Sequence, residues 1–116
     1  TYTVVNNSTI AGQISNGNVN ICTSLVTNMN ELFKNNSNFN SNIGFWDTSN
    51  VTTTRNMFES ATSFNQPNGN WDVSKVEGMG GMFEENPKFN QDLSGWCVSQ
   101  ISSEPEPMHS VKKHMV

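Results

Sequence analysis

One interval of 25 residues separates matching residues along most of this chain. Self-similarity at a period of about 20–50 residues is typical of solenoids, in which each repeat is one turn stacked on its neighbour. The spacing therefore predicts a stack of similar turns rather than a globule with unrelated corners. It is kept by tryptophans, by two sets of phenylalanines, by asparagines and by aliphatic residues: Trp46, Trp71, Trp96; Phe33, Phe58, Phe83; Phe39, Phe64, Phe89; Asn40, Asn65, Asn90; Val26, Val51, Val76, Ile101.

The composition fits a slim stack and excludes two classes of partner. Of 116 residues, 34% are hydrophobic and 14% charged, so the polar residues are mainly uncharged Asn, Ser and Thr. A net charge of -4 argues against nucleic-acid binding, which needs a basic face. No apolar run reaches the roughly 18–20 residues of a membrane helix, so we expect no membrane insertion. Since the chain has no initiator Met and no signal peptide, we expect a mature or excised segment.

The pattern inside each repeat predicts a helix followed by a strand. Residues at i, i+3, i+6 and i+7 from Val51, Val76 and Val26, all apolar except Thr54, are typical of one helical face. The segments 39–43, 64–68 and 89–93 are expected to form one brief parallel strand per turn. The expected fold is an α/β solenoid, a short right-handed leucine-rich-repeat-like stack of about three turns. Residues 1–25 would be an N-terminal cap, 26–101 three repeats, and 102–116 an irregular tail.

Most recurring residues are interpreted as structural. The three tryptophans and the six phenylalanines at the 25-residue spacing are expected to pack inside the stack. Exposed indoles would instead offer a flat platform for sugar rings. The recurring asparagines are expected to form an amide ladder, each side chain bonding the backbone of an adjacent turn.

No catalytic or metal site stands out from the repeat. Asp47 and Asp72 align, but Cys97 replaces them in the third repeat, which favours an Asx turn over a catalytic pair. His109 and His114 lie in the unpatterned tail, so neither a metal nor a cofactor is expected. Cys22 and Cys97 lie three periods apart, roughly 14 Å in a regular stack, beyond the ~7 Å limit between the Cα atoms of a disulfide. Both are then free or paired outside this segment.

Several short segments of the sequence resemble the repeat of one family of surface proteins. They include Met57-Phe58 and Met82-Phe83, with 64–67 (FNQP) and 71–76 (WDVSKV). Together they are similar to the repeat of BspA-like leucine-rich-repeat surface proteins of the Bacteroidetes type, over about residues 20–105. The resemblance implies a secreted or surface-anchored bacterial protein with an adhesion role and no catalytic residues. Thr54 departs from it, since the family pattern prefers Met there.

The expected function is non-enzymatic recognition or adhesion outside the cell or on a bacterial surface. Its partner would be a protein or a glycan on another surface, and we expect the stack to self-associate end to end. The alternatives are a carbohydrate-binding module that uses exposed tryptophans and a passive spacer of a larger adhesin. The polar face of the predicted strands is the candidate contact surface: Ser41, Asn42, Gln66, Asn68, Gln91 and Asp92.

Overall fold

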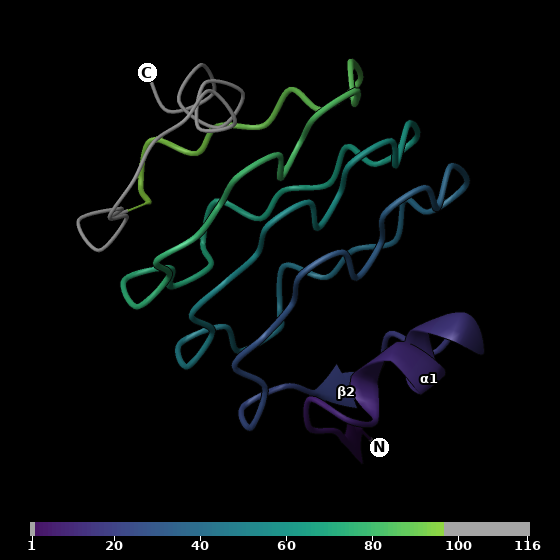
Figure 1. The fold of residues 1–116 in the computed structure, drawn as a ribbon, viewed down its shortest axis with the longest axis vertical. Coiled ribbons are helices and arrows are strands. Elements are labelled where there is room, and N and C mark those ends of the chain that lie inside the picture. The colour runs from purple at the N-terminus through teal and green to yellow at the C-terminus, as the bar shows by residue number, and fades with distance from the viewer. Residues whose placement is uncertain (1, 97–116) are drawn as a thin grey trace.

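The first 25 residues carry all the regular secondary structure of the described chain. A computed structural model describes residues 2–96. Strand β1 (Thr3–Val4) pairs in parallel with β2 (Ile21–Cys22), and helix α1 (Ile10–Ser15) lies between them in sequence. The side chain of Asn6 accepts hydrogen bonds from the N–H groups just before α1, and Gly17 (φ 79°) follows its end. Figure 1 shows these elements together at one end of the molecule.

From residue 26 to residue 96 the chain forms coils that lie one above another (Figure 1). We name them coil 1 (26–50), coil 2 (51–75) and coil 3 (76–96, as far as described). Each coil has a ladder segment (27–35, 52–60 or 77–85) and a return segment (39–46, 64–71 or 89–96). Parallel bridges join Asn28 to Thr53 and Thr53 to Gly78, so residues one period apart are neighbours in space.

The ladder segments are joined by main-chain hydrogen bonds at every second residue. In coil 1, for example, the N–H groups of Glu31 and Phe33 donate to carbonyls of coil 2 at 2.9 and 2.8 Å. The N–H groups of the alternate residues donate locally, three residues back, as Leu32 does to Met29 and Lys34 does to Glu31. The same alternation links coil 2 to coil 3. Most main-chain N–H groups of this side therefore bond other main-chain groups, and asparagine side chains accept a few others, as Asn30 Oδ1 does from the N–H of Arg55.

The ladder segments are not the helices that the apolar spacing predicts. They consist of turns, and α1 is the only helix among residues 2–96. Two residues of each ladder segment have left-handed backbone angles, which interrupt a right-handed helix after one turn. In coil 1 they are Glu31 (φ 60°) and Asn35 (φ 63°). The pattern at i, i+3 and i+7 thus arises from a compact run of turns that buries the same apolar side chains.

The return segments also differ from the expectation, since none of them forms a strand. They are joined by side chains instead of by a main-chain ladder. The N–H of Asn65 donates to Asn40 Oδ1 at 2.8 Å, and the N–H of Asn90 donates to Asn65 Oδ1 at 2.9 Å. The recurring asparagines therefore supply the acceptors that a neighbouring strand would otherwise supply.

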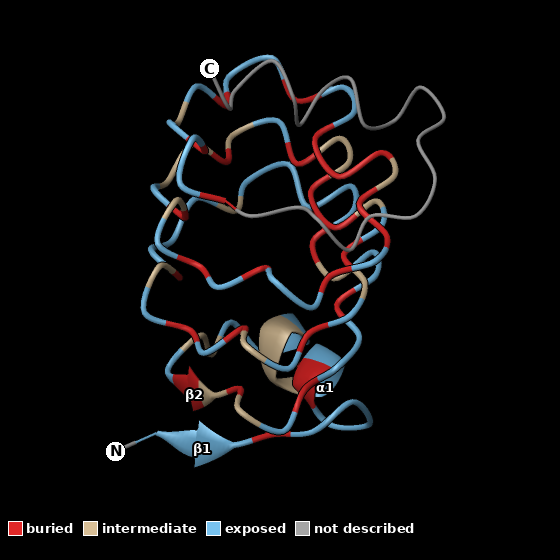
Figure 2. Ribbon diagram, turned by 90° about the vertical axis from the view of Figure 1, so that its left-hand side faces the viewer, coloured by how far each residue is buried: buried red, intermediate tan, exposed pale blue. Residues whose placement is uncertain are grey.

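Aromatic rings fill the space between the two sides of each coil. Trp46, Trp71 and Trp96 stack at centroid distances of 6.4 and 6.5 Å with interplanar angles of 3°. The two phenylalanine sets stack in the same way, at 5.4–5.8 Å along the axis. Buried positions recur along both sides of the coils (Figure 2). Stacked aromatic pairs add about 0.5–1.5 kcal/mol each beyond the burial of their area.

Candidate recognition surface and cap pocket

The return segments form the polar side of the coils, and two of its glutamines hold the coils together. Gln66 Nε2 donates to the carbonyl of Asn40 at 2.9 Å. Gln91 Nε2 makes the equivalent bond to the carbonyl of Asn65 at 3.2 Å, and bonds Asn65 Oδ1 at 2.8 Å. Both glutamines are half-buried. Each of these two side chains reaches back over the preceding coil and covers part of its surface.

One column of this side is exposed in all three coils. It consists of Asn42, Pro67 and Asp92, which lie one period apart. Asn42 Oδ1 accepts the N–H of Gly44, and Asp92 Oδ1 accepts the N–H of Ser94, both at 2.8 Å. These bonds fix the two side chains in place while leaving them open to solvent. Ser41 is exposed beside the column in coil 1.

Asn68 does not belong to the contact surface that the sequence predicts. It is fully buried, because it occupies the core position of Ile43 and Leu93 in the other coils. Within residues 2–96, neither Nδ2 nor Oδ1 of Asn68 has a hydrogen-bond partner. Its main-chain carbonyl is used, however, and accepts the indole N–H of Trp96 at 3.0 Å. A buried amide without partners costs about 1–3 kcal/mol.

The tryptophans are not available as a sugar platform. Each of Trp46, Trp71 and Trp96 is only 4% exposed. Their indole N–H groups donate to main-chain carbonyls of the preceding turn, as Trp71 does to Ile43 at 3.0 Å. A carbohydrate site built from exposed tryptophans therefore has no support in this structure.

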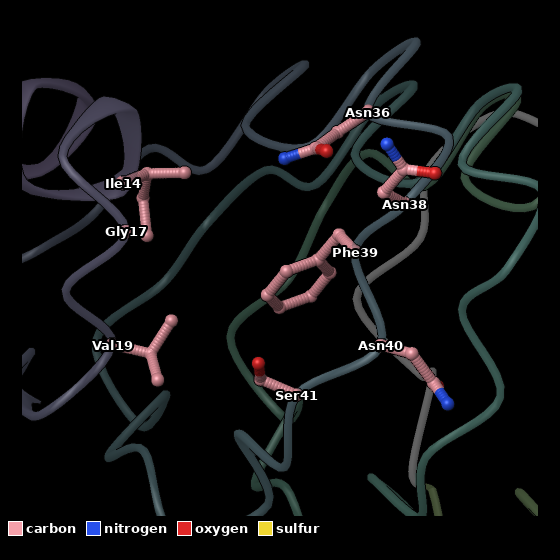
Figure 3. A pocket seen from close by; sticks show the side chains of 8 residues that line it. All are labelled: Ile14, Gly17, Val19, Asn36, Asn38, Phe39, Asn40 and Ser41. Atoms are coloured by element: carbon pink, nitrogen blue, oxygen red, sulfur yellow. The ribbon is translucent and has the colours of Figure 1, made fainter.

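A pocket of about 190 Å³ opens where the cap meets coil 1 (Figure 3). Ile14 and Val19 form one wall, and the ring of Phe39 stands opposite them. Polar side chains surround the ring, with asparagines on one side and the Ser41 hydroxyl on the other. No lining residue carries a charge. The full lining is Ile14, Gly17, Val19, Asn36, Asn38, Phe39, Asn40 and Ser41.

The pocket exists because the repeat is broken at this point. Ile14 lies one period before Phe39 and is smaller than the phenylalanines that cover Phe39 and Phe64 from the other side. Phe39 is therefore half-buried, whereas Phe64 is fully buried. Ser41 stands where the later coils have a glutamine, and it is too short to reach back over the cap.

The carboxylates of Asp47 and Asp72, at the ends of coils 1 and 2, accept the hydrogen bonds that stabilise turns. The hydroxyls of Ser49 and Ser74 each donate at 2.6 Å to Oδ1 of Asp47 and Asp72, respectively, and these bonds lower the pKa of both carboxyls. The N–H groups of the same serines donate to the same oxygens at 3.0 Å. These are Asx turns that connect a return segment to the next ladder segment.

Cys22 is a free thiol in a broader hollow at the cap end. Its pKa is lowered by hydrogen bonding with Ser24, whose hydroxyl lies 3.5 Å from Sγ. Tyr2 and Phe45 line the same hollow, with ring centroids 5.8 Å apart. Cys97 lies outside the described residues, as do His109 and His114. Within residues 2–96, no group of three or more His, Cys, Asp and Glu side chains is placed to hold a metal.

The sequence interpretation missed the pocket because it classed Phe39 with the core. Two departures from the 25-residue pattern mark the site, the isoleucine at position 14 and the serine at position 41. Asn36 and Asn38 carry no repeat signal, because coils 2 and 3 have other residue types at one or both of the matching positions. Only the structure brings these two asparagines to the ring.

Stacked coils, joined by main-chain bonds on one side and side-chain amides on the other, define a repeat protein. Its family is shown by a match over residues 3–115 to the one described as "Mycoplasma protein of unknown function, DUF285". The chain belongs to this family. No curated protein and no solved structure gives a significant match. In the part of the chain that the structure describes, no helix has the length and apolar character needed to cross a bilayer.

Proposed function

We propose that this chain is a short solenoid of the BspA-like leucine-rich-repeat type that serves as a non-enzymatic recognition module on a bacterial surface. The observation that supports the proposal most is the fixed polar side of the coils. There the side chains of Asn42 and Asp92 are exposed, yet each is held by a hydrogen bond to its own turn. A preorganised surface loses little conformational entropy when a partner binds.

The chemistry of the described residues supports recognition more than catalysis. The carboxylates of Asp47 and Asp72 are engaged in turns, and their lowered pKa keeps them ionised at neutral pH. A general acid or base is most effective when its pKa lies near the working pH. The exposed residues of the return side are instead short, polar and mostly uncharged, as in many protein-binding and glycan-binding surfaces.

Arrays of glycans and of host and bacterial surface proteins, probed with the intact chain, would test the proposal. Any ligand found would then be titrated against Pro67→Arg, which places a large charge in the exposed column. Thr62→Arg is the matched control, because Thr62 is exposed in the same coil but lies outside the return segment. We expect Pro67→Arg to weaken binding at least about tenfold, by blocking close contact, and Thr62→Arg to leave it unchanged.

Two outcomes would remove the proposal. One is an unchanged affinity of every ligand for Pro67→Arg. The other is a complete absence of ligands on both arrays, which would favour the passive spacer of a larger adhesin.

A further inference from the structure

We infer that the pocket between the cap and coil 1 binds a single neutral sugar ring, such as the terminal residue of a glycan. This deepens the proposed recognition function and rests on it. The site differs from a tryptophan platform, because its aromatic surface is the one half-buried ring of the phenylalanine ladder, Phe39.

The aromatic wall suits the apolar face of a pyranose. Phe39 is the first ring of its ladder and stacks on Phe64 at 5.6 Å with an interplanar angle of 10°. Phe33 packs closer still, with its ring centroid 4.0 Å from that of Phe39 and an interplanar angle of 13°. The part of the Phe39 ring that these two phenylalanines leave exposed lines the pocket, across from Ile14. The C–H groups on one side of a pyranose carry partial positive charge, which the negative face of an aromatic ring attracts.

The polar rim suits hydroxyl groups. Figure 3 shows the amides of Asn36 and Asn38 on one side of the ring and the Ser41 hydroxyl on the other. None of these three side chains makes a hydrogen bond within residues 2–96. Side-chain amides and hydroxyls can both donate and accept hydrogen bonds. The hydroxyl groups of a sugar can do the same, so the two are complementary.

The main-chain N–H of Asn40 adds a hydrogen-bond donor to the pocket, because the series of asparagine side chains that accept such bonds does not extend into the cap. The N–H groups of Asn65 and Asn90 each donate to an asparagine side chain one coil earlier. The residue one period before Asn40 is Ser15, which lies in α1 and offers no amide. The N–H of Asn40 has no acceptor among the described residues, so it is available to a ligand oxygen.

Size and charge narrow the class of ligand. A pocket of about 190 Å³ is smaller than the roughly 300–1,000 Å³ that encloses drug-sized molecules, so it holds one ring and not an extended chain. The lining has no Lys, Arg, Asp or Glu. Phosphates, carboxylates and amines would find no counter-charge here, which favours an uncharged hexose or N-acetylhexosamine.

The probes for the test are methyl glycosides of glucose, galactose, mannose and N-acetylglucosamine, titrated into the intact chain. Saturation-transfer NMR detects the contact, and chemical shifts of the Phe39 ring and the Asn40 amide locate it. We expect at least one glycoside to shift both signals with a Kd of about 1 mM, a usual strength for a single small site.

The decisive variant is Ser41→Gln, which introduces the glutamine of the later coils. By analogy with Gln66, its side chain would extend back over the cap and fill the pocket. We expect glycoside binding about tenfold weaker or lost, with an unchanged melting temperature because Ser41 is exposed. A second pair compares Asn38→Ala with Ser63→Ala, the same repeat position one coil away from the pocket. Only Asn38→Ala should weaken binding.

Failure of this inference differs from failure of the proposed function. If no glycoside shifts the Phe39 and Asn40 signals, or if Ser41→Gln binds as well as the natural chain, the sugar pocket is wrong. The recognition surface would still stand if Pro67→Arg weakened the binding of another ligand. An amino acid or acetylated peptide that shifts the same signals when no glycoside does would also overturn the assignment to sugar.

Discussion

Hydrogen bonds join neighbouring coils on both the ladder side and the return side, but the two sides use different bonding groups. On the ladder side, most bonds between coils join main-chain groups, and few of them depend on a particular side chain such as Asn30. On the return side, Asn40 and Asn65 supply the acceptors with their side chains. A side that depends on particular side chains changes its shape wherever one of them changes. The comparison explains why the pocket opens on the return side, at Ser41.

The largest effect is expected in the core that both sides share. Trp71→Ala removes a buried indole that stacks between two others and donates its N–H to the carbonyl of Ile43. We expect a loss of about 3–5 kcal/mol in the free energy of unfolding, measured by urea denaturation. Trp71→Phe, which keeps a ring but loses the N–H donor, should lose less. A loss below about 1 kcal/mol for Trp71→Ala would show that the indole column does not hold the sides together.

Asn68→Leu is expected to stabilise the protein. The substitution gives coil 2 the aliphatic residue type that coils 1 and 3 have at this position, and removes two buried polar atoms without partners. Its main-chain carbonyl, which accepts the Trp96 indole N–H, is retained. We expect a gain of about 1–3 kcal/mol in the free energy of unfolding. A destabilised variant would mean that the Asn68 amide has a role that the described contacts do not show.

A matched pair compares the two sides directly. Asn65→Ala removes the acceptor of the Asn90 N–H and of Gln91 Nε2, and should cost about 1–2 kcal/mol. Thr52→Ala, on the ladder side of the same coil, removes a hydroxyl but keeps the main-chain bond of Thr52 to the Thr27 carbonyl. It should cost less than about 0.5 kcal/mol. Equal losses by urea denaturation would remove the distinction between the sides.

The sequence predicts the arrangement along the stack better than the path of each coil. The 25-residue spacing places like rings at like positions, and the structure stacks Trp46 on Trp71 and Trp71 on Trp96. The bonding partners of the recurring asparagines also follow from the spacing. These features depend only on which residues recur, and recurrence is visible in one sequence.

The helices and strands of the repeat were predicted wrongly for a physical reason. Apolar spacing reports which side chains are buried, and turns with left-handed residues at Glu31 and Asn35 bury them at nearly helical intervals. Neither Glu nor Asn marks such a turn as clearly as glycine would, although Gly81 occupies the matching position in coil 3. The pocket was missed for the opposite reason, since it lies where recurrence stops.

The smallest effect concerns the Asx turns that link the two sides at the coil ends. Hydrogen bonds from Ser74 lower the pKa of Asp72 below 3.8, its ordinary value. The folded state therefore binds this proton less readily than the unfolded state does. The stabilisation is present above pH 3.8 and is lost as the pH falls through the folded pKa. The urea midpoint should stay constant from about pH 7 to pH 5 and fall in more acidic solution.

The variant Asp72→Asn distinguishes the contribution of Asp72 to the acid-induced loss of stability from that of the other carboxyl groups. Asparagine can accept the same N–H bond but does not titrate, so the acid-induced fall in the urea midpoint should be smaller than in the natural chain. Glu77→Gln is the control, because Glu77 is exposed and makes no side-chain hydrogen bond among the described residues. If both variants show the same fall as the natural chain, the turn at Asp72 adds nothing to the join between return and ladder segments. In that case the ladder bonds and the ring stack hold the coil ends without it.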